Sequence, residues 1–242
     1  MMMKPLTAAL TVFTYASGAQ AGTYSVPEGC SGFLTVQSRM CEVDHYWRCE
    51  ADPEGVFWRL TIQSDGPSLL SKLDSEYRWL EMFRLKTARR EQMSQEVDPQ
   101  SMSELLETGS DSWTFDQDWF ERGEFLTTER YSGYDRLTGD TVEIDGVTLR
   151  QTEYHMRSEF SATGETFVAT GNEYVYERFN IFLGGIGVIE SRQGREEYDN
   201  TPVEFSEPGE QGFLATSPLF DCGDILSGLD VPLSQHEGTR RL

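Results

Sequence analysis

Apolar and polar residues alternate along much of this chain, most clearly between residues 131 and 190. Residues 141–144 alternate, Asp145 and Gly146 follow, and the alternation resumes at Val147. An Asp-Gly pair between two alternating runs is a strong signal for a tight hairpin, because a type I′ turn needs positive φ at both central positions. This segment therefore predicts two antiparallel strands joined by a two-residue turn.

Similar breaks recur roughly every ten residues, a spacing typical of an all-β sandwich, barrel or open curved sheet. Residues 137–140 and 162–165 have the composition of turns, and Gly184 with Gly185 indicates a strand bend or bulge. We predict an all-β protein, an antiparallel meander that forms a barrel or a curved half-barrel.

One short helix is expected near residues 99–108. Asp98 suits the N-cap, Pro99 suits the first helical position, and Gly109 suits the residue after the last turn. Met102, Leu105 and Leu106 would give this helix its apolar side.

The domain organisation is expected to be simple. Residues 1–21 resemble a signal peptide: Lys4 is followed by a modest apolar segment, and Ala19-Gln20-Ala21 fits a cleavage site. Residues 22–234 are expected to form a single β domain, and residues 235–242 a disordered tail. The mature protein is therefore expected to be periplasmic or secreted.

The acidic composition narrows the class of partner. The formal net charge is −21 at pH 7, which argues against nucleic acid because phosphate binding needs clustered Lys and Arg. A basic envelope protein remains compatible with this charge. After residue 21 no stretch is apolar and long enough to span a membrane.

The four cysteines Cys30, Cys41, Cys49 and Cys222 predict two disulfides in an exported chain. If residues 41–49 form one strand, Cys41 and Cys49 lie about 27 Å apart and cannot pair. Cys30–Cys41 with Cys49–Cys222, which we favour slightly, and Cys30–Cys49 with Cys41–Cys222 both remain open. Either pairing ties the C-terminal Cys222 to the first strands.

The sequence offers few candidates for catalysis or metal binding. Three histidines are present, His45, His155 and His236, without a nucleophile-elbow motif. The spacing of the cysteines and His45 matches no zinc pattern. We expect no metal, no cofactor and no catalytic histidine.

Acidic residues near tryptophans favour one enzymatic alternative. Asp111, Asp116 and Asp118 cluster around Trp113 and Trp119, as the acids of a hydrolase acting on envelope polymers would. A solvated acidic loop explains the same residues. A third hypothesis is an acidic protein-interaction module.

The leading hypothesis is a non-enzymatic envelope protein that binds a small apolar or amphipathic ligand in the concavity of its sheet. Such a site needs inward-facing apolar side chains on successive strands. The candidate ligand-lining residues are Trp58, Leu60, Ile62, Trp79 and Phe167.

Three phrases of the sequence, residues 32–38, 137–149 and 208–214, resemble a family of exported β-rich proteins from marine alphaproteobacteria. The resemblance covers most of the mature chain and implies export and two disulfides. It implies no activity, cofactor or catalytic residue.

Overall fold

The computed structural model describes residues 22–223. The predicted signal peptide and the predicted tail lie outside these residues. The described chain forms thirteen strands and one helix: β1 (Cys30–Ser38), β2 (Glu42–Cys49), β3 (Phe57–Gln63), β4 (Gly66–Leu73), β5 (Trp79–Arg84), β6 (Arg89–Asp98), α1 (Met102–Thr108), β7 (Ser110–Glu121), β8 (Glu124–Ile144), β9 (Val147–Phe160), β10 (Thr166–Tyr176), β11 (Ile181–Ser191), β12 (Gly194–Asp199) and β13 (Pro202–Ser206).

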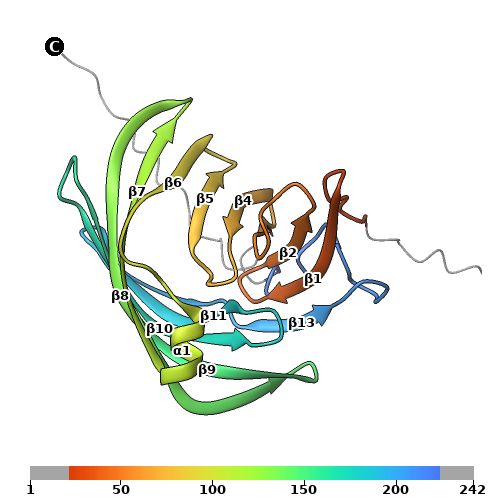
Figure 1. Cartoon of the computed structure of the whole chain (residues 1–242). Coiled ribbons are helices and arrows are strands. Elements are labelled where there is room, and N and C mark those ends of the chain that lie inside the picture. Colours follow the sequence, from red (N-terminus) through yellow and green to blue (C-terminus); the bar gives the residue numbers. More distant parts are fainter. Residues whose placement is uncertain (1–21, 224–242) are drawn as a thin grey trace, which may run out of the picture.

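All thirteen strands belong to one antiparallel sheet, in which β1 to β12 pair in chain order and β13 pairs with β1. The sheet is not closed, and β12 and β13 are its edges. The two edge strands are consecutive in the chain. The residues between them bond to both ends of the sheet: the Asn200 N–H donates to the Gly185 carbonyl of β11, and the Arg39 N–H, which follows β1, donates to the Thr201 carbonyl. The sheet therefore curls strongly, as Figure 1 shows. The predicted meander and curved half-barrel are confirmed.

Side chains alternate between the two faces of a strand. Those that point to the concave face of the sheet form the main core. Its buried apolar side chains come from strands at both ends of the sheet and from α1. They include Leu34, Tyr46, Phe57, Leu73, Met102, Leu105, Leu149, Tyr174, Ile181 and Phe182. The short helix thus fills part of the interior.

The convex face of the first strands carries a second apolar cluster, built on Val43, Trp47, Leu60 and Ile62. Tyr24 packs against this cluster. The chain after β13 also returns to this region: the Leu214 N–H donates to Thr35 Oγ1, and the Leu219 N–H donates to Gln37 Oε1. Thr35 and Gln37 are buried polar side chains whose oxygens accept these bonds, which therefore anchor the C-terminal segment.

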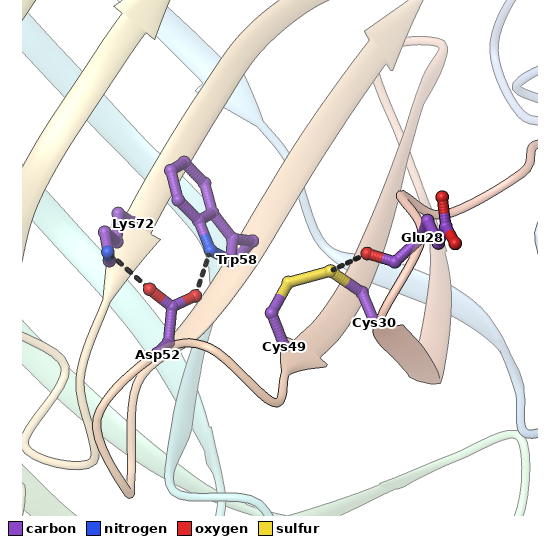
Figure 2. The surroundings of a disulfide bond; sticks show 6 residues. All are labelled: Glu28, Cys30, Cys49, Asp52, Trp58 and Lys72. Carbon is purple, nitrogen blue, oxygen red and sulfur yellow. Dashed lines mark hydrogen bonds and ion pairs between the residues drawn. A yellow bond between two sulfur atoms is a disulfide. The ribbon is translucent and has the colours of Figure 1, made fainter.

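Two disulfides connect the four cysteines, Cys30–Cys49 and Cys41–Cys222. The slightly favoured pairing was wrong. Cys30 and Cys49 are register partners at the open end of the β1–β2 hairpin (Figure 2), whereas Cys41 lies in its turn. Cys30 and Cys41 are therefore separated by the length of β1, about 27 Å at ~3.4 Å per residue. Two disulfides are typical of an oxidising compartment outside the cytosol.

The helix begins later than the predicted residue 99. Its N-cap is Ser101, whose side chain accepts from the Glu104 N–H, and Asp98 is the last residue of β6. Gly109 ends the helix with φ of 91°, as predicted. Pairing of β6 with β7 extends the strand to Asp98 and overrides the Asp-Pro start signal.

One predicted turn is a bulge within a strand. Residues 137–140 lie inside β8, the long bent strand at the left of Figure 1. The register with β9 shifts between Leu137 and Thr141. Turn-forming residues here bend the strand instead of reversing the chain, and pairing with β9 resumes at Thr141.

The Asp145-Gly146 hairpin is confirmed, since Ile144 pairs with Val147 and the two turn residues have φ of 49° and 74°. Gly146→Val should lower the free energy of unfolding by about 1–3 kcal/mol, because a β-branched residue is strained at this φ. Gly146→Asn is the matched control and should lower it by less, because Asn tolerates positive φ. Urea denaturation measures both, and equal midpoints for the two variants would contradict the turn's role.

Within residues 22–223, no helix has the length and apolar character needed to cross a membrane.

Candidate functional site

A cavity of about 630 Å³ lies on the concave side of the sheet. Its wall combines residues from the first five strands with residues from β10, β11 and β12. Met40, Lys86 and Thr87 belong to turns at its rim and are exposed, whereas Tyr46 and Tyr77 are buried deep in the wall. The volume falls within the usual range of small-molecule sites, about 300–1,000 Å³.

One part of the cavity wall is apolar. Its side chains come from β4, β5 and β11 and are Leu69, Trp79, Phe182, Leu183 and Ile189. Trp79 also packs edge-on against Phe115 and Tyr131, so its ring is held between the cavity and the aromatic cluster beyond it. This part of the wall can bury the hydrocarbon portion of a ligand.

The other part of the wall is polar and includes Arg59. Arg59 of β3 is the register partner of Tyr46 of β2, so both side chains project from the same face. Arg59 Nη1 donates to the Tyr77 hydroxyl (3.1 Å), which donates to the Phe182 carbonyl (2.9 Å). This chain of hydrogen bonds ties the first strands to β11 across the interior.

Three polar atoms of cavity-lining residues are buried without a partner among the described residues: Arg59 Nε, the Tyr46 hydroxyl and Asn200 Oδ1. Burial opposes the charge of Arg59, but nearby Tyr77 and Asp44 raise its pKa, so the guanidinium stays protonated. Burial raises the pKa of Tyr46 well above its usual value, so that its hydroxyl keeps its proton. Arg59 Nε and the Tyr46 hydroxyl are therefore hydrogen-bond donors without a partner, and they belong to neighbouring groups, because Arg59 opposes the rise in the pKa of Tyr46.

Asp44 and Glu42, the neighbouring acids on β2, already have partners. Thr61 Oγ1 donates to Asp44 (2.5 Å). Glu42 accepts from Gln63 (3.3 Å) and Asn200 (3.1 Å). Burial raises the pKa of Asp44 to about 6, although Arg59 opposes this shift.

Glu173 of β10 faces the cavity from the opposite part of the sheet. Burial is the main reason that its pKa rises to about 8, and the nearby Asp135 adds to the rise while Arg59 opposes it. Glu173 is therefore mostly protonated at pH 7 and contributes a neutral carboxylic acid to the wall.

Of the five candidate ligand-lining residues, Trp79 lies on the cavity wall. Trp58, Leu60 and Ile62 pack in the convex-face cluster, because they alternate with Arg59 and Thr61 along β3. Phe167 packs edge-on against Phe160 and is not among the residues that line the cavity. Alternation indicated one face of β3 correctly as apolar, but the cavity lies on the other face.

The acids near Trp113 and Trp119 do not line the cavity. Asp111 is buried and accepts from the Ser101 N–H. Asp116 and Asp118 occupy even-numbered positions of β7 and therefore project from the opposite face to Asp111. Asp116 accepts two hydrogen bonds from Arg130, and Asp118 accepts one from Thr128. Each of the three acids thus has a partner that accounts for its position.

The two histidines in the described part of the chain pack against aromatic rings. His45 is fully buried, shares a hydrogen bond with Thr35 Oγ1 (3.0 Å) and stacks on Tyr24. Burial lowers its pKa to about 4. His155 stacks on Tyr134, and His236 lies outside the described residues. In the described part of the chain, no three His, Cys, Asp or Glu side chains gather closely enough to hold a metal ion.

Comparisons with protein-family models, with curated proteins and with solved structures find no match. The cavity and its side chains are therefore the basis for a functional proposal.

Proposed function

We propose that this chain is a non-enzymatic binding protein of an oxidising compartment, and that it holds an amphipathic small molecule inside its curled sheet. The cavity supports this proposal: it has the volume of a ligand site and joins an apolar wall to a polar one. An amphipathic ligand would match both parts. A purely apolar ligand would leave the polar groups of the wall without partners, at a cost of about 1–3 kcal/mol for each buried group.

The rigidity of the surrounding structure also supports a preformed site. Cys41–Cys222 and the hydrogen bonds of Thr35 and Gln37 hold the C-terminal segment against β1, next to the cavity rim. A preformed site loses less conformational entropy on binding than a flexible one does. The acids near Trp113 and Trp119, on which the hydrolase alternative rests, lie away from this site.

The proposal is tested by blocking the cavity. Leu69 lines the cavity, whereas its neighbour Leu70 packs in the convex-face cluster. Leu69→Trp should fill part of the cavity, and Leu70→Trp is the matched control on the other face. Native mass spectrometry of protein purified from its own host should show a bound molecule in the wild type and in Leu70→Trp, but not in Leu69→Trp.

Two outcomes would count against this function. Wild-type protein that carries no small molecule, and that also binds none of a panel of single-chain amphipaths in titrations, would remove its basis. A bound molecule retained equally by Leu69→Trp would place the binding site elsewhere. Circular dichroism of each variant confirms that its sheet is intact.

A further inference from the structure

Arg59 has no direct ion-pair partner in the described residues, and Asp44 and Glu42 act on its charge only from a distance. A guanidinium carries five N–H donors, of which Arg59 uses one on a neutral tyrosine hydroxyl. Its Nε is buried without a partner, and Arg59 makes no ion pair within residues 22–223. A buried N–H donor without an acceptor is costly, so the unpaired Nε indicates an acceptor supplied from outside the chain.

The carboxylates that line the cavity do not neutralise this charge by direct contact. Asp44 accepts from Thr61, and Glu42 accepts from Gln63 and Asn200. Glu173 is mostly a neutral acid at pH 7, and Glu196 is exposed at the rim. Asp44 and Glu42 favour the charged form of Arg59 from a distance, yet they leave its Nε without an acceptor.

The other two cations of the cavity wall are already paired. Arg84 binds the fully buried Glu91, and Lys86 binds Asp65 (2.5 Å). A single guanidinium thus remains for a ligand, which suits a monoanion better than a phosphate dianion. The planar N–H fork of arginine matches a carboxylate, which it can bind through two parallel hydrogen bonds.

We propose that the ligand is a long-chain monocarboxylate of the fatty-acid class, with its carboxylate on Arg59 and Tyr46 and its hydrocarbon chain along Trp79, Phe182 and Leu183. This inference rests on the proposed function and names its ligand class. The carboxylate accepts from Arg59 Nε and from the Tyr46 hydroxyl, the two donors without a partner. The apolar wall then removes the chain from water.

Isothermal titration calorimetry at pH 7 with three probes of equal chain length tests the assignment. Dodecanoate, dodecan-1-ol and dodecylamine, each below its aggregation concentration, differ only in their head groups. The wild type should bind dodecanoate roughly tenfold or more tightly than dodecan-1-ol, since a hydrogen bond to a charged group contributes more than a neutral one. Dodecylamine should bind least tightly, because its cation would lie beside Arg59.

Arg59→Met should abolish the preference for dodecanoate while dodecan-1-ol still binds, and Arg59→Lys should retain part of it. Arg136→Met is the matched control, because Arg136 is an exposed residue that pairs with Glu153 outside the cavity. This variant should keep the wild-type preference. If Arg59→Met does not fold, Tyr46→Phe provides the second variant and should weaken dodecanoate binding more than dodecan-1-ol binding.

Each result has a distinct meaning. Equal binding of the three probes, or a preference for dodecylamine, would overturn the carboxylate assignment and leave the proposed function standing. A dodecanoate preference that survives in Arg59→Met would also overturn the assignment. Failure of all three probes to bind would overturn this inference, and the proposed function would fall with it only if the purified wild type also carries no small molecule.

Discussion

Replacing Cys41 and Cys222 by serine is expected to lower the free energy of unfolding by about 5 kcal/mol. This disulfide joins residues 181 positions apart, and a crosslink that closes so long a loop removes much of the entropy of the unfolded chain. It also fixes the segment whose N–H groups satisfy Thr35 and Gln37. Urea denaturation of the double variant, compared with the wild type, measures the loss.

The second disulfide provides the matched comparison. Cys30–Cys49 spans 19 positions, and the same chain-entropy model gives about 3 kcal/mol for its removal. The Cys30→Ser and Cys49→Ser double variant should therefore unfold at a higher urea concentration than the Cys41 and Cys222 double variant. The reverse order would show that the long crosslink does not hold the C-terminal segment as described.

Stability should fall by about 2 kcal/mol between pH 6.5 and pH 8 because of Glu173. Its pKa is raised from 4.5 to about 8, so the folded protein keeps a proton that the unfolded chain has released. The stabilising contribution is complete below pH 4.5 and is lost as the pH rises through about 8. The slope for one proton is about 1.4 kcal/mol per pH unit.

Glu173→Gln keeps a neutral side chain of similar shape and should remove most of this slope. Glu143→Gln is the control, because Glu143 is exposed on β8, and it should leave the slope unchanged. His45 does not account for the effect: its lowered pKa of about 4 stabilises the fold as the pH rises toward 6.5, which is the opposite sign. Urea midpoints that are flat from pH 6.5 to 8 in the wild type would contradict the burial of Glu173 as a neutral acid.

Local patterns predicted the meander well because each hairpin is specified within a few residues. The turn at Asp145 and Gly146 needs positive φ at both residues, and both residue types accept it: Gly because it lacks a side chain, and Asp because its side chain is short and polar. Residues 137–140 show the limit of this reasoning. They have turn-like composition, yet pairing with β9 on both sides of the bulge keeps them in a bent strand.

The cavity was harder to predict, because alternation gives the two faces of a strand without saying which face is concave. On β3, Trp58, Leu60 and Ile62 are more apolar than Arg59 and Thr61, which favoured them as the ligand-lining set. Tyr24 and Val26, which precede β1, pack against that apolar face in the structure. Only the tertiary arrangement distinguishes a face covered by the chain from a face that surrounds a cavity.

Arg59 was missed for a related reason. A single arginine in a strand is ordinarily exposed, and nothing adjacent in the sequence indicates burial. The one available signal was its position in an alternating run whose other members on that face are Phe57, Thr61 and Gln63. The sequence carried no signal for Glu173 either, since its raised pKa depends on burial by distant strands and, less, on Asp135.

A crystal structure of the protein grown with saturating dodecanoate tests the central claim most directly. The account predicts continuous elongated density inside the cavity, between Arg59 at one end and the apolar wall of Trp79 and Phe182 along its length. A cavity that contains only water under these conditions, or a ligand found only on the convex face beside Trp58, would contradict it.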